Sequence, residues 1–283
     1  MTTISISNNG LKRMLNISKR KQTVNGKQQS QVESCVLSCD GSKARITSLT
    51  RDLTGLTEVV ADVEGTGNIP IPDIDRVLGV LSLHGENLTL SWDGGKNKLR
   101  FKSAGKQTTL DSSFEAKAFT HSQETIKDFS LRSETLANKI DPKSGKYTLS
   151  DGTKQQSFCS FEVNVADLYD ACRCDTINGQ RLNRYSFTIP DAGSYEEHGD
   201  CFRITVGDPS LGQTTSEIVM EKKNLMPIDG FSWDFDGGLD ELFKGFTGKA
   251  TLHFFDFREH GQGIRFAVSF GNDEFAFQSG TLG

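Results

Sequence analysis

The stretch DIDRVLGVLSLHGENLTLSW, residues 73–92, changes its hydrophobic period abruptly. Apolar residues first recur at helical spacing, at Ile74, Val77, Leu78 and Leu81. The second half alternates apolar and polar residues, as a half-buried strand does. Pro72 suits the start of a helix because that position needs no N–H, and Gly85 suits its end. The stretch therefore predicts a short helix that is followed at once by a strand.

The same arrangement is predicted ahead of this stretch. Residues 3–7 alternate as a strand, and residues 9–18 place Leu11, Met14, Leu15 and Ile17 on one face of a helix that Asn8 or Asn9 can cap. Three strands are expected after that helix, at residues 33–39, 43–49 and 57–64. The segment CDGSK is typical of a hairpin turn between the first two. After the quoted helix, three more strands are expected at residues 87–92, 98–102 and 107–111.

The second half of the chain repeats the pattern. A strand at 158–163 precedes a helix in VADLYDACRCDTING, and strands are expected at 184–189, 201–206 and 216–221. A second cycle has a strand at 230–235, a helix in GGLDELFKGFTG, and strands at 249–257, 263–270 and 274–278. The repeated unit, counted four times, is a strand, a short helix and three strands.

These elements predict an α+β fold with two similar domains, residues 1–112 and 158–283. Each domain is expected to hold two of the repeated units, with antiparallel sheets that carry short helices on one face. Residues 113–157 are rich in Ser, Thr and Lys, and we interpret them as an interdomain connection with a short amphipathic helix near residues 126–140.

Composition limits the class of protein. The longest apolar runs fall short of the ~18 residues of a membrane span, and the N-terminus lacks a charged leader with an apolar core. The protein is therefore expected in the cytosol, and its six cysteines are expected to be free thiols. Cys172 and Cys174 resemble half of a metal site, but no second pair has matching spacing, so no metal and no cofactor are predicted.

We find no catalytic set in the sequence. None of the histidines lies in a motif with a Ser or Cys nucleophile; they are His84, His121, His198, His253 and His260. There is no G-x-S-x-G and no glycine-rich phosphate loop. The acidic segment DFDGGLDE lacks the spacing of a calcium loop and is better explained as a helix cap with first-turn acids. An enzyme is therefore not expected.

The distribution of charge is more informative than the net charge of −5. Residues 1–30 carry six basic residues and no acid. Basic side chains are expected to project away from the apolar faces of the predicted helices and from the turn after the first helix. These residues are Lys12, Arg13, Lys19, Arg20, Lys21, Arg76, Arg173 and Lys244. Without base-reading motifs, such residues suit DNA backbone phosphates. The alternative is a solvated, mobile basic loop.

Three stretches of this pattern resemble DNA polymerase sliding clamps of the phage type, with a PCNA-like fold. They are VLGVLSLHGENLTLSWDGGKNKLRFKSAGKQTTL (77–110), FEVNVADLYDACRCDTING (161–179) and GFTGKATLHFFDFREHGQGIRFAVSF (245–270). The resemblance implies a processivity factor that encircles double-stranded DNA and binds a DNA polymerase and a clamp loader. Family rings contain six domains, so two domains per chain imply a homotrimer. For a phage-encoded clamp, the compartment is the bacterial host cytoplasm.

The resemblance also implies that the first-domain helix and the turn after it face the central hole. The second-domain helices hold Asp167, Asp170, Asp240 and Glu241 beside Arg173 and Lys244, so the lining is expected to be unevenly positive. Two alternatives stay open. One is a monomeric processivity factor of the same fold that holds DNA by charge alone, and the other is a β-rich structural phage protein.

Overall fold

The computed structural model describes residues 1–24, 27–111, 123–174, 184–189, 201–208, 210, 212–225 and 231–280. They form two compact units. Unit 1 comprises Met1–Lys19, Gln31–Arg51 and Thr57–Ala137, and unit 2 comprises Arg20–Ser30, Asp52–Leu56 and Asn138–Gly283. The chain therefore passes between the units more than once. His121, His198 and residues 113–122 of the expected connection lie outside the described residues.

The rest of the expected connection divides between the units. Helix α3 (Gln123–Ala137) groups with unit 1, in the region where a helix was expected. The three short strands that follow it belong to unit 2. The domain boundaries at 112 and 158 stay a prediction.

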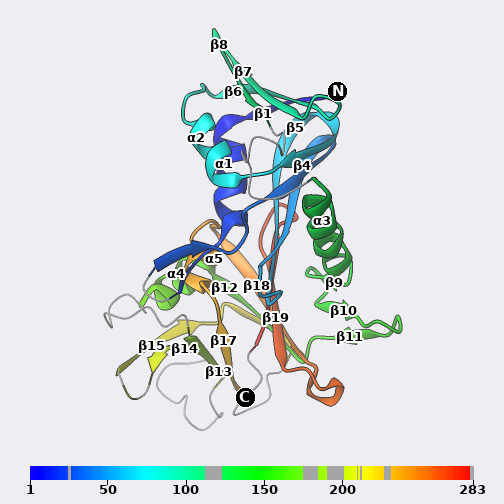
Figure 1. Cartoon of the computed structure of the whole chain (residues 1–283). Coiled ribbons are helices and arrows are strands. Elements are labelled where there is room, and N and C mark those ends of the chain that lie inside the picture. Colours follow the sequence, from blue (N-terminus) through cyan, green and yellow to red (C-terminus); the bar gives the residue numbers. More distant parts are fainter. Residues whose placement is uncertain are drawn as a thin grey trace. The chain divides into compact units, whose positions relative to one another are not determined.

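Besides α3, unit 1 has one sheet and two short helices that pack together, and Figure 1 shows these two helices in blue and cyan. The two helices are α1 (Asn8–Lys19) and α2 (Ile74–Leu81). The strands are β1 (Thr2–Ser7), β4 (Cys35–Leu49), β5 (Gly55–Ile71), β6 (Asn87–Asp93), β7 (Lys98–Ser103) and β8 (Lys106–Asp111). The strand order is β4-β5-β1-β6-β7-β8, and β1, β6, β7 and β8 pair antiparallel with their neighbours. The predicted helix and strand of residues 73–92 are confirmed as α2 and β6.

The ends of the two helices are fixed by polar side chains. The Ser7 hydroxyl accepts the Gly10 N–H at 3.1 Å, so Ser7 caps α1, and the expected caps at Asn8 and Asn9 are wrong. The buried Asn8 amide instead donates to the carbonyls of Leu81 and His84, at 3.0 and 2.8 Å. These bonds give a side-chain donor to the carbonyl at the end of α2 and to one in the turn just beyond it. Asn8 thereby ties the start of the first helix to the end of the second.

The expected hairpin turn at CDGSK is wrong, because β4 continues through it from Cys35 to Leu49. The Asp40 carboxylate accepts the N–H groups of Ser42 and Lys43, at 3.0 and 2.8 Å. Gly41 takes a φ of +114°, which a side chain would oppose. A local irregularity therefore replaces a reversal, and the strand resumes.

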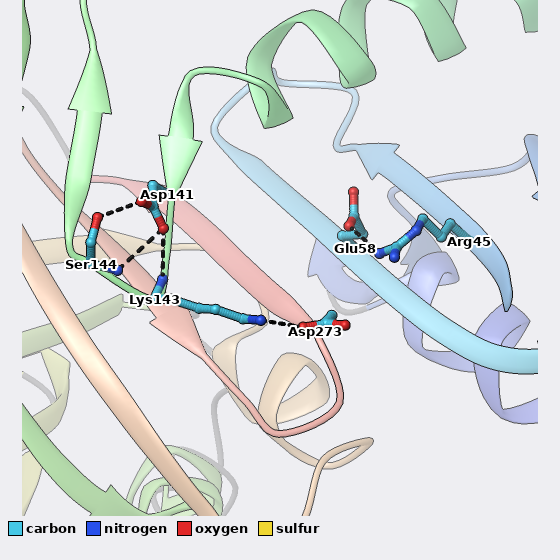
Figure 2. A network of polar contacts seen from close by, with 6 residues as sticks. All are labelled: Arg45, Glu58, Asp141, Lys143, Ser144 and Asp273. Atoms are coloured by element: carbon cyan, nitrogen blue, oxygen red, sulfur yellow. Dashed lines mark hydrogen bonds and ion pairs between the residues drawn. The ribbon is translucent and has the colours of Figure 1, made fainter. Parts of the chain in front are cut away.

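Cross-strand ion pairs continue beyond this irregularity. Lys43 Nζ lies 2.6 Å from Asp62 Oδ1, and Arg45 Nη1 lies 3.2 Å from Glu58 Oε1 on β5, as Figure 2 shows for the second pair. The two strands expected at 33–39 and 43–49 are thus one long strand, and the chain reverses only between β4 and β5.

Unit 2 contains helices α4 (Val165–Arg173) and α5 (Leu239–Phe243), which pack together. Its larger sheet has the order β16-β12-β18-β19-β20 and a second sheet has the order β15-β14-β13-β17. The strands of both sheets are β12 (Cys159–Asn164), β13 (Arg184–Ile189), β14 (Cys201–Asp208), β15 (Gly212–Val219), β16 (Lys222–Leu225), β17 (Phe231–Asp236), β18 (Lys249–Asp256), β19 (Ile264–Ser269) and β20 (Phe275–Ser279). A 3-10 turn follows β18 at Arg258–His260, and the short hairpin strands β2 (Lys21–Val24) and β3 (Lys27–Ser30) also belong to this unit.

Phenylalanines fill the core of unit 2. Phe187 lies at the centre, with its ring 5.2 Å from Phe202, 5.1 Å from Phe235 and 5.5 Å from Phe266 between ring centroids. These rings are fully buried. Each buried aromatic contributes a large apolar area, and tilted or edge contacts between rings add to it. The aromatic cluster therefore holds the two sheets of the unit together.

The strands β9 (Ile140–Asp141), β10 (Lys146–Thr148) and β11 (Lys154–Gln156) form a small sheet against β18–β20. Tyr147 inserts its ring 4.9 Å from Phe257 and 5.9 Å from Phe277, and the Arg265 guanidinium lies over the same rings. Figure 2 shows the turn beside it, where Asp141 accepts the N–H of Ser144 and Lys143 pairs with Asp273.

Candidate nucleic-acid interface

Helix α1 presents two basic side chains on its exposed side. Leu11, Met14 and Leu15 are fully buried, whereas Arg13 is exposed and Lys12 is half-exposed. The helix itself contains no acidic residue. The prediction that Lys12 and Arg13 lie off the apolar face is confirmed by this burial pattern.

Lys19, at the end of α1, is placed differently from its prediction. The residue is buried, and its ammonium forms an ion pair with Asp75 on α2. The expectation that Lys19 projects away from the packed face is therefore wrong. The pair neutralises one charge at the junction of the two helices, and Lys19 acts as a link between them. Asp75 itself remains largely exposed.

Arg20 is also buried, with only 3% of its surface exposed, so its expected place on a DNA-facing turn is wrong. Its Nη2 donates to Gln278 Oε1 at 2.6 Å within unit 2. Burial lowers the pKa of Arg20 to about 10, and the charges of Asp52, Tyr185 and Asp240 oppose that shift. Lys21, the next residue, is half-exposed at the start of β2.

Arg76 is exposed on α2, which packs against α1. Its backbone N–H donates to the Asp73 carboxylate at 2.9 Å, and this bond caps the helix. Unit 1 therefore brings Lys12, Arg13 and Arg76 to the exposed sides of two adjoining helices. The neighbouring acid of α2, Asp75, is the residue that Lys19 pairs with.

The helices of unit 2 carry basic residues that acids already accompany. Arg173 and Lys244 are exposed, but Arg173 Nη1 lies 3.6 Å from Asp170 Oδ1 and Lys244 Nζ lies 3.8 Å from Glu241 Oε1. Both acids stand three residues earlier, in DACR and ELFK. The sequence analysis expected an unevenly positive lining from these acids, and the structure places Asp170 and Glu241 beside the two basic residues.

The thiol and carboxylate side chains show whether the described residues could form a metal site. Among the described residues, no group of three or more His, Cys, Asp or Glu side chains could hold a metal ion. Cys172 is buried and Cys174 is half-buried, and both are free thiols. No described helix combines the length and apolarity that crossing a membrane requires.

No protein-family model and no curated protein matches the sequence. Solved structures do match, and they define the chain as a protein with the DNA polymerase sliding-clamp fold. The chain is similar to the sliding clamp of Bacillus subtilis, with a TM-score of 0.62 and 12% identity over 99% of this chain. It is similar to the DNA polymerase III beta subunit of Thermotoga maritima and the beta sliding clamp of C. crescentus, each with a TM-score of 0.60 and 13% identity over 99% of this chain.

The likeness covers almost all of this chain but only part of each matched clamp. The chain spans 64% of the Bacillus and Thermotoga structures and 66% of the C. crescentus structure. At this identity the comparison shows the fold, and the predicted α+β clamp architecture is confirmed.

Proposed function

We propose that this protein is a non-enzymatic sliding clamp that encircles duplex DNA and tethers a replicative DNA polymerase. The observation that carries the proposal is the sliding-clamp fold across 99% of the chain. The basic, acid-free helix α1 supports it, because cations displayed without base-reading side chains hold a duplex by its phosphates and leave it free to slide.

The DNA path includes the exposed sides of α1 and α2 in unit 1. Lys12, Arg13 and Arg76 supply charge from the exposed helix sides, and Lys21 can add to it. Arg173 and Lys244 contribute less, because a phosphate must compete with their neighbouring acids. Lys19 and Arg20, which were expected to face DNA, instead stabilise the protein.

Tethering explains how a protein without catalysis increases the length of DNA that a polymerase copies. A polymerase that lets go of its template stays close while it is bound to a ring that cannot leave, so its effective concentration near the template remains high. A closed ring needs to be opened, so a clamp loader is the second proposed protein partner. If a phage encodes the chain, both partners act in the cytoplasm of the bacterial host.

A homotrimer is the proposed assembly, and two strands offer its interface. In the described part of the chain, β8 and β15 each pair on one side only, at the ends of their sheets. Val219 on β15 is an apolar side chain that is 66% exposed at one of these edges. Pairing of β8 with β15 of the next copy would cover both edges, and a heterologous contact that closes gives a ring.

Light scattering with and without closed circular DNA and a loader tests the proposal. A trimeric mass, together with longer synthesis by the cognate polymerase, is expected. A stable single-chain mass would instead favour the monomeric processivity factor of the same fold. Failure to bind duplex at low salt would favour the structural phage protein, which needs no affinity for DNA.

A further inference from the structure

A second basic surface lies on the sheet of unit 1, on the face opposite α1 and α2. Strand β7 has the sequence KLRFKS, in which Leu99 and Phe101 are fully buried and the alternate residues point the other way. Those alternate residues are Lys98, Arg100 and Lys102. The cations therefore recur at period two, which is a strand signal and not a helix signal.

The strand register defines the surroundings of each cation. Arg100 lies between Ser91 of β6 and Thr109 of β8, and Lys102 lies between Thr89 and Gln107. Opposed residues on one face of an antiparallel sheet have Cβ atoms about 5 Å apart. Each of these two cations is therefore flanked on both sides by neutral polar groups. The row continues to β1, where Thr3 donates to Ser91 at 3.1 Å between hydroxyl oxygens.

Lys98 differs from the other two cations. It lies between Asp93 and Asp111 in the register, so acids offset its charge. In the ranges that the structure describes, no acidic side chain pairs with Arg100 or Lys102. Lys102 is exposed and Arg100 is half-exposed, so both can reach a ligand. These two residues, with Thr89, Ser91, Thr109 and Gln107 around them, form what we call the β7 face.

We propose that the β7 face binds the phosphodiester backbone of duplex DNA, outside any duplex that the helices hold. Lys, Arg, Ser and Thr side chains are the groups that contact phosphate oxygens without reading sequence. The face combines these two cations with the accessible hydroxyl groups of Thr89 and Thr109 on the neighbouring strands, whereas the Ser91 hydroxyl is buried. Contacts of this kind are wet and polar, and they need no apolar centre.

The composition of the face separates duplex DNA from other acidic ligands. A protein partner would need buried aromatic or aliphatic anchors, but the apolar side chains of β6 and β7 point into the core. A single strand would need aromatic rings on which bases stack, and the aromatic residues of β6 and β7, Trp92 and Phe101, are buried on the opposite face. The duplex backbone needs neither apolar anchors nor stacking rings.

Binding here would give the protein a hold on DNA that does not depend on threading. A closed circular duplex cannot pass through a ring without a loader, but it can still contact an outer surface. Co-sedimentation of the full chain with relaxed closed circular plasmid, without loader and at low salt, therefore reports on the β7 face. The assay needs no polymerase, so a failed tethering function and a failed β7 face give different results.

The decisive variant is Arg100→Glu with Lys102→Glu, and we expect it to bind closed circles at least about tenfold more weakly. The matched control is Lys127→Glu with Lys154→Glu, which makes the same change in net charge at exposed positions on α3 and β11. Circular dichroism checks folding, and the milder Arg100→Gln with Lys102→Gln should reproduce the weaker binding if the first variant misfolds.

Three results would overturn the proposal. The first is binding of the Arg100 and Lys102 variants that equals the binding of the control. The second is displacement of duplex by polyglutamate at equal concentration of charge, which would make the face a site for acidic peptides. The third is tighter binding of single-stranded than of duplex circles.

Discussion

Nη2 of Arg20 donates to Oε1 of Gln278 at 2.6 Å, across 258 positions of sequence. Nε2 of Gln278 donates in turn to the carbonyl of Asp236 at 3.0 Å and to the hydroxyl of Thr54 at 3.2 Å. One buried pair thus joins the segment after α1, the turn before β5 and the last strand of unit 2. Arg20 is therefore a structural residue.

Replacement of Arg20 by Met should lower the free energy of unfolding by about 2 kcal/mol. The change leaves the buried Gln278 oxygen without its charged donor, and an unsatisfied buried group costs about 1–3 kcal/mol. Urea unfolding measures the decrease. The same variant, at a temperature where it is folded, should bind duplex DNA as well as the parent does. A selective decrease in DNA affinity with unchanged stability would show that Arg20 contacts DNA.

Gly55 should not tolerate a side chain. A Cβ atom there would lie 2.1 Å from Arg20 Nη1 and 2.8 Å from Gln278 Oε1, closer than nonbonded atoms approach. We expect Gly55→Ala to destabilise the protein by about 1–3 kcal/mol through overpacking. Thermal unfolding tests this, with Gly79→Ala as the control because nothing lies within 4 Å of a Cβ at that position. Equal melting temperatures for both variants would contradict the packing of Arg20.

Lys12→Ala with Arg13→Ala should weaken retention of the loaded protein on DNA equally for all sequences. The slope of log affinity against log salt should fall by about 1 for each phosphate that the variant no longer neutralises. Arg173→Ala with Lys244→Ala is the matched pair from unit 2, and it should change the slope less because each cation already has an acidic neighbour. Equal slopes for the two double variants would mean that both units carry the DNA path alike.

The assembly prediction rests on the open edge of β15. Val219→Asp should shift the mass measured by light scattering from three chains towards one, because a carboxylate at that edge would be desolvated in the interface. Leu131→Asp on α3 is the control, since that leucine is 64% exposed but lies on no sheet edge. An unchanged trimer in the Val219 variant, or dissociation in the Leu131 variant, would place the interface elsewhere.

Stability should fall as the solution is acidified from about pH 6.5. His253 is buried on β18, with Nδ1 2.9 Å from the Ser160 hydroxyl oxygen, and burial lowers its pKa while the Pro142 backbone and Asp141 oppose the shift. The unfolded chain then binds more protons than the folded chain between the folded pKa and about 6.5, so stability rises with pH in that window. His253→Gln should reduce the difference between urea midpoints at about pH 8 and about pH 5.5. Burial also lowers the pKa of His84, so part of the dependence should persist.

The amino-acid sequence alone predicted the short helices and most of the strands around them, although not the strand count after the first helix. The change of period within residues 73–92 depends only on which neighbouring side chains share a face, so α2 and β6 could be predicted closely. The same local rule located α1, α4 and α5 and the exposure of Lys12 and Arg13. It also suggested the clamp fold that structural comparison confirms.

Only the tertiary structure decided where the remaining basic residues lie. Lys19 and Arg20 follow the apolar stripe of α1, and the sequence alone suggests that both are solvated. In the structure both are buried, because Lys19 pairs with Asp75 and Arg20 donates to Gln278, two residues that are distant in the chain. The continuity of β4 depended likewise on its pairing with β5, which outweighed the local turn signal in CDGSK. Local periodicity shows which face of a helix or strand is apolar. Which segment packs against that face depends on contacts between parts of the chain that are far apart in sequence.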